Sequence, residues 1–409
     1  MKICQINSVY AQGSTGKIVQ DIHNTLIERG HESYVIYGDR KGNPHYENVF
    51  SVSNKLTRRI SVLINRFVGL QYAGAFFQTR RALGIIRKLN PNVVHIQNIN
   101  GGFVNIYKLL SFLAKNNIKT VVSIHGEFMY TGSCGSALDC NKWKTGCGSC
   151  PRKYYATKSY LYDSSGIAWR KMKSTFGLFK ENNIIITGVS KWVKDRASES
   201  PILKGIKPIV VHNGVDENIF SPLPYSEMSN KYNISTEIVI LYVTAYFETE
   251  INGHKGGKYI LELAELLKEQ NVKIIIAANY GSGDRLPDNV FYHGRTKTQL
   301  ELAQLYSMAD LTVITSVRET FSMPVAESLS CGTPVVGFKA GGPETIALKD
   351  YSEFVEYGNL DNLYESVVKW MKVKREQPEE LSKLPQKARS LYSKQQMVNN
   401  YMEIYNKLI

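Results

Sequence analysis

Short apolar runs, rich in β-branched residues, recur along this chain and are separated by stretches long enough for helices. Two of them, Ile184-Ile185-Ile186 and Ile274-Ile275-Ile276, lack the polar alternation of a half-exposed strand. We therefore expect strands that are buried on both faces, which favours an α/β fold with parallel sheets covered by helices. The predicted strands are residues 2–6, 33–37, 93–97, 119–124, 184–188, 238–243, 272–278, 311–315 and 334–338.

The length of the chain indicates two domains. Its 409 residues, 43% of them hydrophobic, can fill two cores at roughly 150–200 residues per domain. A proline-bounded segment from Ser200 to Pro208 follows a helical stretch, so we place the boundary near residue 207. The predicted organisation is a first doubly wound lobe over residues 1–206, a second over 207–385, and a C-terminal helix over 386–409 that is long enough to cross back to the first lobe.

Two glutamates follow a predicted strand of the second lobe. Glu319 lies in the loop after the strand, and Glu327 lies in the first turns of a helix that we expect to begin around Pro324, since proline favours the first helical turn. Open α/β sheets bind ligands at the carboxyl ends of their strands, and helix N-termini bind phosphate. Glu327 is placed to accept hydrogen bonds from ribose hydroxyls, and Glu319 to hold sugar hydroxyls. Taken alone, both also fit solvated charges stabilised by the helix dipole.

The glutamates stand in a longer block that continues through the glycine-containing segments 331–337 and 339–344. This block resembles the retaining family 4 glycosyltransferases, whose signature is two glutamates separated by seven residues. The resemblance covers nearly the full chain and implies the glycosyltransferase-B fold, an α/β fold of two Rossmann-like lobes with an interlobe cleft. It also implies that Glu319 contacts the donor sugar, that Glu327 contacts the nucleotide ribose, and that the backbone around Phe321, Ser322 and Met323 binds the diphosphate.

The same resemblance implies a positive clamp on the diphosphate. Family members carry an arginine and a lysine on the first loop of the second lobe, and these offset the charge of the leaving group. Lys255 matches the lysine, although a solvated loop lysine would look the same. Tyr246 stands where the family has the arginine, and a longer insertion through Asn252 follows. The candidates to replace the missing charge are Arg318, Arg295 and His254.

The first lobe carries Gly13-Ser14-Thr15-Gly16 between its first strand and a helix expected to begin near Ile18. A nucleoside triphosphate loop is excluded, because Ala11 stands where that pattern needs glycine and Ile18 where it needs serine or threonine. The family's first-lobe glycine loop fits better, and so does an ordinary strand-to-helix turn. His125 ends a predicted strand, where the family places a histidine that contacts the donor sugar; a structural histidine is the alternative.

These interpretations together give a predicted site. The predicted catalytic residues are Glu319, His125 and Lys255. The predicted donor-binding residues are Gly16, Lys255, Arg295, Phe321, Ser322, Met323 and Glu327. The predicted acceptor-side residues are Ser14, Thr15, Asn98 and Asn100, of which the last two lie in a loop similar to one in bacterial polysaccharide-building family members.

Four cysteines crowd into residues 134–150, an insert that similar bacterial transferases also carry after the first-lobe histidine. Thiolates at this spacing suit a tetrahedral structural zinc, and reduced thiols in a loop are the alternative. The resemblance implies that the transfer itself requires no metal and no cofactor beyond its nucleotide-sugar substrate. The predicted zinc ligands are Cys134, Cys140, Cys147 and Cys150.

The chain has a formal net charge of +14, which suits nucleotide diphosphates, an anionic membrane or nucleic acid. Residues 51–90 are basic and rich in aromatic residues, and contain no acidic residue. Such a segment can rest on an anionic membrane, or form a solvated helix face over a core stripe. We expect no nucleic acid partner, because no recognition motif accompanies the charge. With no apolar run long enough to span a membrane, we expect a cytoplasmic protein, at the inner face of the membrane if residues 51–90 bind it.

The predicted function is transfer of a hexosyl unit, with retention, from a nucleoside diphosphate sugar to a saccharide or lipid-linked saccharide. The resemblance implies a role in bacterial capsule, O-antigen or exopolysaccharide assembly. Two alternatives stay open at this point, because fold alone does not fix chemistry. One is a sugar-nucleotide epimerase on the same fold, and the other is a carbohydrate-binding scaffold without turnover.

Overall fold

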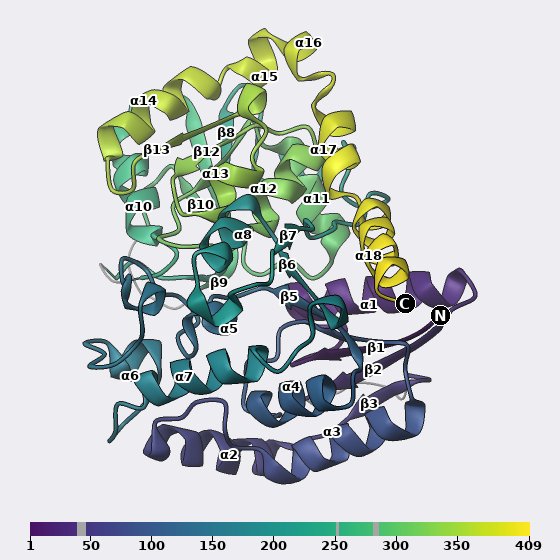
Figure 1. The fold of residues 1–409 in the computed structure, drawn as a ribbon. Helices are drawn as coiled ribbons and strands as arrows, with labels where there is room; N and C mark the ends of the chain where they lie inside the picture. The colour runs from purple at the N-terminus through teal and green to yellow at the C-terminus, as the bar shows by residue number, and fades with distance from the viewer. Residues whose placement is uncertain (39–45, 251–252, 281–285) are drawn as a thin grey trace. The chain divides into compact units, whose positions relative to one another are not determined.

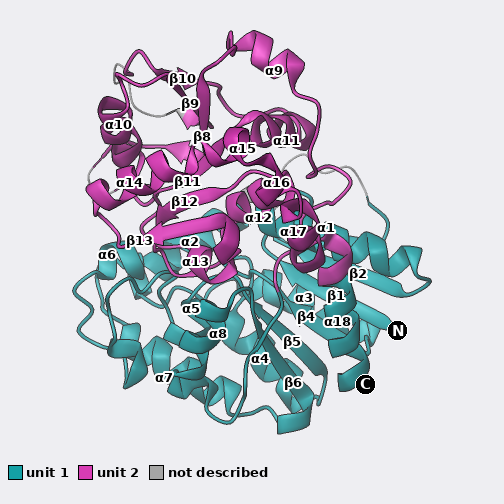
Figure 2. Ribbon diagram, turned by 90° about the horizontal axis from the view of Figure 1, so that it is seen from above, with its two compact units in different colours: residues 1–211, 398–409 teal, residues 212–397 magenta. Residues whose placement is uncertain are grey.

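The computed structural model describes residues 1–38, 46–250, 253–280 and 286–409. These residues form two compact units (Figure 2). Unit 1 comprises Met1–Val211 and Val398–Ile409, and unit 2 comprises His212–Met397. The division therefore falls after Val211 rather than near residue 207, and the returning C-terminal segment begins at Val398 rather than at residue 386.

Unit 1 is built on a parallel sheet that has, in the described part of the chain, seven strands in the order β3-β2-β1-β4-β5-β6-β7 (Figure 1). The central strand β4 is buried along its whole length, as expected for a strand that helices cover on both faces. The strands are β1 (Lys2–Asn7), β2 (Glu32–Tyr37), β3 (Val49–Ser51), β4 (Val93–Ile96), β5 (Lys119–Ile124), β6 (Ile184–Gly188) and β7 (Ile209–Val210).

Helices connect these strands and cover the sheet. The α-helices are α1 (Gly13–Glu28), α2 (Lys55–Val68), α3 (Phe76–Leu89), α4 (Ile106–Lys115), α5 (Phe128–Thr131), α6 (Lys153–Ala156), α7 (Ser165–Phe176) and α8 (Lys191–Ser198). Short 3₁₀ helices are η1 (Lys142–Lys144), η2 (Glu181–Asn183) and η3 (Pro201–Leu203).

Unit 2 contains a second parallel sheet, with six strands among the described residues, in the order β10-β9-β8-β11-β12-β13. Its core is apolar: Ile240, Ile274 and Ile276 are fully buried with Leu263 and Val367 from the covering helices. The strands are β8 (Ile238–Phe247), β9 (Val272–Tyr280), β10 (Val290–Tyr292), β11 (Leu311–Ile314), β12 (Val335–Phe338) and β13 (Ser352–Val355).

The helices of unit 2 complete the same alternation. They are α9 (Ser226–Lys231), α10 (Gly257–Leu266), α11 (Gln299–Met308), α12 (Met323–Ser330), α13 (Gly342–Ile346), η4 (Lys349–Tyr351), α14 (Leu360–Trp370), α15 (Val373–Glu376), α16 (Pro378–Leu381) and α17 (Leu384–Tyr392). Helix α18 (Lys394–Leu408) begins in unit 2 and ends in unit 1. No helix in the described ranges is both long and apolar enough to cross a membrane.

The prediction of a single C-terminal helix is wrong, because Ser393 interrupts the helix. That residue has extended backbone angles, so α17 and α18 are separate helices. Two tyrosines of α18 hold it to the sheet of unit 1: the Tyr405 hydroxyl lies 2.7 Å from His95 Nδ1, and the Tyr401 hydroxyl lies 2.8 Å from Ser123 Oγ. These buried polar contacts, far apart in sequence, fix the end of the chain on unit 1.

Each sheet has a point where the direction of winding reverses. In unit 1 this point lies between β1 and β4, and in unit 2 it lies between β8 and β11. Doubly wound sheets bind ligands in the crevice outside the carboxyl ends of the strands at such a point. The loops that follow these four strands are therefore the first places to look for a site.

Candidate active site

The loop after β8 carries Lys255 and is fixed against the end of β11. The hydroxyls of Tyr242 and Thr315 both donate to the Lys255 carbonyl, at 2.6 and 3.0 Å. Gly256 has a left-handed φ of 68°, and a Cβ there would lie 2.0 Å from the Thr315 carbonyl oxygen. Only glycine permits this close approach, and the approach positions the lysine at the winding reversal of unit 2.

Lys255 and Glu319 form an ion pair at this position. The Lys255 ammonium lies 2.7 Å from Glu319 Oε1, and Ser316 Oγ donates to the same oxygen at 2.8 Å. The Glu319 side chain is largely buried, whereas the Lys255 side chain is partly exposed. The structure thus brings together two of the three predicted catalytic residues, from loops 64 positions apart in sequence. Ser316 is a partner that the sequence analysis missed.

The loop after β12 braces the backbone of Glu319. The Glu319 amide donates to Ala340 at 3.0 Å, and the Gly342 amide donates to the Glu319 carbonyl at 2.8 Å. A Cβ at Gly342 would lie 2.4 Å from the Thr320 carbonyl carbon. The glycines of segment 339–344 therefore let two loops pack backbone to backbone, which holds the carboxylate of Glu319 in one place.

Ser322 forms the entry to helix α12 in a strained conformation. Its φ of 79° is left-handed, it is buried, and its side chain makes no cap to the helix. The helix begins at Met323, one residue before the predicted start. Because Ser322 does not cap them, the first amides of α12 are suited to an anion. Phe321 itself packs in unit 2 against the rings of His212 and Tyr392, so only its backbone is available to a ligand.

Glu327 lies in α12, almost fully buried. The Tyr306 hydroxyl, from α11, donates to Glu327 Oε2 at 3.1 Å. Burial first, and then this carboxylate, raise the pKa of Tyr306 well above its usual range, so the tyrosine acts as a donor at all ordinary pH values. A buried carboxylate at this point of α12 is the feature expected of a ribose acceptor.

The predicted substitutes for the family arginine lie in different places. Arg295 is exposed in the loop after β10, an edge strand that β9 and β8 separate from β11. Arg318 directly precedes Glu319, and the His254 carbonyl accepts from the Val317 amide at 3.0 Å. Arg318 and His254 therefore lie in the two loops that carry the ion pair.

Tyr246, which stands in place of the family arginine, is exposed near the end of β8, after a bulge. The insertion predicted through Asn252 partly lies outside the described residues, which omit 251–252.

In unit 1, helix α1 begins at Gly13 rather than near Ile18. Ser14 and Thr15 consequently lie in its first turn, where Ser14 is exposed. Gly16 is buried: its carbonyl accepts from the Ala11 amide at 3.0 Å, and a Cβ there would lie 3.1 Å from Val9 Cγ2. Gly16 therefore packs inside this turn, and contact between it and a donor stays a prediction.

His125, the third predicted catalytic residue, follows β5 in unit 1. Its Nε2 lies 2.8 Å from Gln97 Oε1, and because an amide oxygen only accepts, the ring nitrogen donates. Burial lowers the pKa of His125 to about 4, so the ring is neutral at physiological pH. Gln97 follows β4 and was missed as a site residue, although it stands in the same run as His95.

Asn98 and Asn100, the asparagines predicted on the acceptor side, follow Gln97 in the loop after β4. The Asn98 amide donates to Asn7 Oδ1 at 3.0 Å, and the Ser8 amide donates to the Asn98 carbonyl at 2.8 Å. Asn98 Oδ1 accepts from the Asn100 amide at 3.2 Å, and Asn100 is exposed. Loops after β1, β4 and β5 thus meet at the winding reversal of unit 1.

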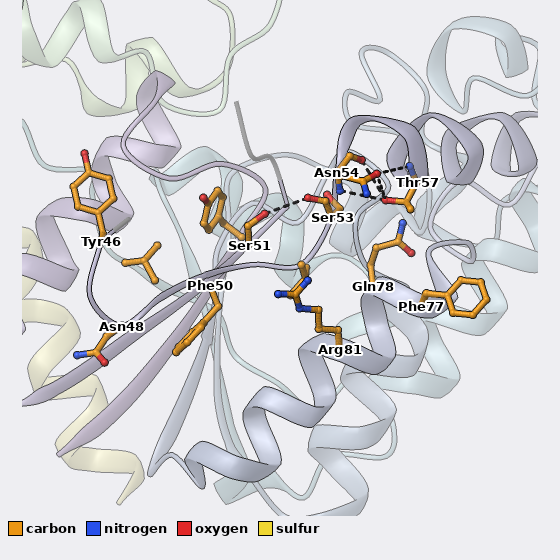
Figure 3. Close-up of a pocket in the computed structure, with 13 residues that line it drawn as sticks. Tyr46, Asn48, Phe50, Ser51, Ser53, Asn54, Thr57, Phe77, Gln78 and Arg81 are labelled. Atoms are coloured by element: carbon orange, nitrogen blue, oxygen red, sulfur yellow. Dashed lines mark hydrogen bonds between the residues drawn. The ribbon is translucent and has the colours of Figure 1, made fainter. Parts of the chain in front are cut away.

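A pocket of about 520 Å³ lies in unit 1 where β2 and β3 end and α2 and α3 begin (Figure 3). Aromatic, amide and hydroxyl side chains surround the Arg81 guanidinium there, a mixture that suits a polar ligand such as a saccharide. No local sequence pattern marks this pocket, because its lining comes from four separate elements. The residues that line it include Tyr46, Phe50, Asn54, Thr57, Gln78 and Arg81.

The four cysteines of residues 134–150 are free thiols that line one small, largely apolar pocket of about 30 Å³ beside Trp143. Burial raises the pKa of Cys134 to about 11 and that of Cys147 to about 12. Within the described ranges, no group of three or more His, Cys, Asp or Glu side chains is arranged to hold a metal ion. The side chains thus gather without forming a coordination shell, and structural zinc stays a prediction.

The chain is similar to known glycosyltransferases. Residues 15–219 match the family described as Glycosyltransferase Family 4, and residues 225–390 match Glycosyl transferases group 1. The putative colanic acid biosynthesis glycosyl transferase WcaC of Escherichia coli K12 is 23% identical over the whole of both chains. The N-acetyl-alpha-D-glucosaminyl L-malate synthase of Bacillus anthracis is 21% identical over 96% of this chain and 93% of its own.

Solved structures share the fold at lower identity. Sucrose-phosphate synthase from Thermosynechococcus elongatus superposes with a TM-score of 0.69 at 14% identity, covering 100% of this chain and 99% of the other. Anabaena HepE, solved in complex with UDP, gives 0.67 at 14% identity, covering 99% of this chain and 100% of the other. The predicted α/β fold of two Rossmann-like lobes is confirmed by the two parallel sheets and by these neighbours.

Proposed function

This chain belongs to glycosyltransferase family 4, and we propose that it transfers a hexosyl unit, with retention, from a nucleoside diphosphate sugar to a saccharide or lipid-linked saccharide acceptor. The single observation that carries the proposal is the Lys255–Glu319 pair at the carboxyl ends of β8 and β11, followed by Glu327 on α12. These groups match the parts of a nucleotide sugar. The lysine and the helix N-terminus suit the phosphates, Glu327 suits the ribose, and Glu319 suits the hexose.

In this proposal each group has one task. Glu327 accepts hydrogen bonds from the ribose hydroxyls, and the first amides of α12 hold the diphosphate. The ammonium of Lys255 offsets the charge that develops on the diphosphate as its bond to the anomeric carbon breaks. Glu319 holds the sugar hydroxyls, and the acceptor hydroxyl attacks the anomeric carbon from the face that the diphosphate leaves.

We assign the acceptor to unit 1. The loops with Ser14, Thr15, Asn98 and Asn100 supply hydrogen-bonding groups, and the pocket around Arg81 adds the polar and aromatic lining that a saccharide needs. The name of the Escherichia coli relative, a putative colanic acid biosynthesis transferase, supports a role in bacterial surface polysaccharide assembly. Contact of residues 51–90 with an anionic membrane belongs to the same proposal, since a lipid-linked acceptor lies at such a surface.

The test begins with a thermal-shift screen of nucleoside diphosphates and their sugars, followed by turnover with the donor that binds. We expect Glu327→Ala to weaken nucleotide binding at least tenfold, and Glu319→Gln to bind nucleotide within about threefold of wild type while losing most turnover. Glu365→Gln, on the exposed part of α14, is the matched control and should change neither quantity. Equal, negligible effects of the two site variants would overturn the assignment.

Product analysis separates this function from its alternatives. With donor and acceptor present, a transferase releases nucleoside diphosphate and forms a new glycoside. An epimerase would convert the donor to a second nucleotide sugar with no acceptor present, and a binding scaffold would leave the donor intact. Either of these results, from protein that binds the nucleotide sugar, would contradict the proposal.

A further inference from the structure

Helix α2 presents an apolar stripe to solvent. Six of its side chains are between 46% and 67% exposed. Most are spaced three or four positions apart, which puts them on one side of a helix. An exposed stripe of this length is unusual for a soluble surface and marks a contact with something else. The six are Leu56, Ile60, Leu63, Ile64, Phe67 and Val68.

The opposite side of α2 is buried and polar. Ser61 and Asn65 are both buried, and each has a partner: Gln78 Nε2 lies 3.3 Å from Ser61 Oγ, and the Gly74 amide donates to Asn65 Oδ1 at 2.9 Å. A helix that covers a core has the reverse arrangement. The six exposed apolar residues of α2 therefore do not contribute to the core of unit 1, so packing within the unit does not explain the stripe.

The segment that contains α6 extends this surface. The Tyr160 amide donates to the Arg66 carbonyl at 2.9 Å, and the rings of Phe67 and Tyr160 lie 6.1 Å apart. Tyr160, Leu161 and Tyr162 are all exposed. Tyrosine rings of this kind, with an apolar body and a polar tip, favour the boundary between water and lipid. We call α2 together with residues 154–162 the apolar face; it includes exposed Tyr154 and Tyr155 as well.

Positive charge surrounds the apolar face. The chain contains no Asp or Glu between Glu47 and Glu127. Arg59 and Arg66, seven positions apart, lie along one border of the stripe. Arg80 and Arg81 are exposed on α3, whose residue Gln78 contacts Ser61 of α2. Basic side chains near an anionic bilayer are attracted to its negatively charged surface.

From this combination we infer that the apolar face docks on the surface of an anionic phospholipid bilayer, with α2 lying in the plane of the surface. The apolar stripe enters the boundary between headgroups and acyl chains, and the flanking arginines contact lipid phosphates. A second copy of the chain fits less well, because two-fold pairing through this face would oppose two basic clusters. The inference deepens the proposed function: it rests on the lipid-linked acceptor and on the membrane contact proposed there for residues 51–90, and it names the side chains that make this contact.

The test is co-sedimentation of the full chain with phosphatidylcholine vesicles, with and without phosphatidylglycerol, in the absence of substrates. We expect binding only to the vesicles that contain phosphatidylglycerol, and weaker binding as salt screens the charges. The double variant Ile60→Glu/Leu63→Glu should lower the partition coefficient at least tenfold. The matched control is Leu300→Glu in α11 of unit 2, since Leu63 and Leu300 are both 52% exposed; it should stay within twofold of wild type.

Circular dichroism melts of each variant establish that it is folded, because both substitutions are at exposed positions. The inference is overturned if the wild-type protein does not bind anionic vesicles. It is also overturned if the Ile60→Glu/Leu63→Glu variant binds them as well as the wild type does. So does a variant that converts a wild-type dimer to a monomer with no vesicle binding in either form. Release of nucleoside diphosphate from the donor in solution is measured on the same samples, so loss of docking and failure of the proposed function give different results.

Discussion

Glu319 and Glu327 lie eight positions apart in one segment, but different partners hold them. A lysine and a serine hold one oxygen of Glu319, at 2.7 and 2.8 Å, in a loop that two other loops brace. Glu327 is buried on α12 and accepts from the hydroxyl of Tyr306. An ion pair can exchange partners when an anionic ligand arrives, whereas a buried tyrosine fixes the direction of a carboxylate. The Lys255–Glu319 pair is therefore suited to a reaction step in which charge develops on the ligand. Glu327 is suited to holding one group of the ligand in a fixed position.

We predict that Tyr306→Phe weakens nucleotide binding without removing the site. The substitution keeps the ring in the core and removes only the donor to Glu327. A hydrogen bond to a charged group contributes about 1.5 kcal/mol, so the dissociation constant for the nucleotide should rise roughly tenfold. Titration calorimetry with the diphosphate that the screen identifies gives the value.

Tyr392→Phe is the control for Tyr306→Phe. It removes another buried tyrosine hydroxyl of unit 2, one that donates to the Ile346 carbonyl. It should cost a similar amount of stability and leave nucleotide affinity within about twofold of wild type. Equal losses of affinity in the two variants would mean that general loosening of unit 2, and not the direction of Glu327, sets nucleotide binding.

At the residue scale, the sequence predicted the charged residues of the site but not the neutral residues that contact them. Glu319, Glu327 and Lys255 stand in a recognisable pattern, and glycines mark the close approaches beside them. Tyr306 contacts Glu327 only because α11 packs against α12, and Gln97 meets His125 only because β4 and β5 are adjacent. Such contacts depend on packing between elements distant in sequence, for which one chain carries no local signal.

At the scale of elements, the sheet of unit 1 buries histidines. His95 on β4 is fully buried between Ser123 and the Tyr405 hydroxyl of α18, and burial lowers its pKa well below its usual range. Burial also lowers the pKa of His23 on α1 to about 4. In the unfolded chain these rings take up a proton near pH 6.5. Between about pH 6.5 and 4 the unfolded state therefore binds more protons than the folded state, and stability falls as the pH falls.

We predict that the free energy of unfolding decreases by about 1.4 kcal/mol per pH unit for each such histidine below pH 6.5. Urea denaturation between about pH 7 and 5.5 measures the slope before most carboxylates titrate. His95→Gln should reduce the slope, and His254→Gln, at an exposed histidine of unit 2, should leave it unchanged. A slope that His95→Gln does not alter would show that His95 is not the source of the acid sensitivity.

A buried ion pair holds the cysteine-rich insert to the rest of unit 1. Glu127 is fully buried, 2.9 Å from Arg196 on α8, and accepts from Tyr130 and from the Ala137 amide. We predict that Glu127→Gln destabilises the protein by about 3 kcal/mol, because it leaves a buried guanidinium without its countercharge. The double variant Glu127→Gln/Arg196→Met should cost less than the sum of the single variants, as a double-mutant cycle in urea would show.

The control for this pair lies on the same helix. Asp195 forms an exposed ion pair with Lys191 at 2.5 Å, and Asp195→Asn should cost at most about 0.5 kcal/mol. A Glu127→Gln variant as stable as Asp195→Asn would mean that the buried pair does not anchor the insert. Zinc content of the purified protein, measured on the same samples, tests the separate prediction of a metal at the four thiols.

The predicted elements show where sequence patterns carry information. Every strand predicted from an apolar run is present, because central parallel strands are buried on both faces and need continuous apolar residues. The strands that were not predicted, β3, β7, β10 and β13, lie at sheet edges, where two to four residues with partial exposure leave no run. In α2 the amphipathic pattern was visible, but the sequence did not indicate that its apolar side faces outward.

At the scale of the whole molecule, the nucleotide acts on unit 2, and protons act more strongly on unit 1 than on unit 2. The residues assigned to the nucleotide, Lys255, Glu319 and Glu327, all lie in unit 2. Unit 1 holds His23 and His125, whose pKa burial lowers to about 4, and His95, whose pKa it lowers well below its usual range. Burial lowers the pKa of His212 and His293 in unit 2 as well, but less. Each unit has its own sheet and its own buried core. A nucleotide stabilises the unit that binds it, and acid destabilises the unit that excludes protons.

We therefore predict that hydrogen exchange at about pH 5.5 is faster than at pH 7.5, after correction for the intrinsic rates, mainly in the strands of unit 1. Nucleoside diphosphate at about 100 times its dissociation constant should add about 2.7 kcal/mol of stability, seen as slower exchange in unit 2. The melting temperature should rise by roughly 5–11 °C, since about 1 kcal/mol raises that of a domain of this size by roughly 2–4 °C. Glu327→Ala should abolish the nucleotide effect and leave the pH effect intact. Nucleotide protection confined to unit 1, or equal acid sensitivity of both units, would contradict these assignments. Unit 2 holds the carboxylates of the proposed nucleotide site, and unit 1 holds the three histidines whose pKa burial lowers most.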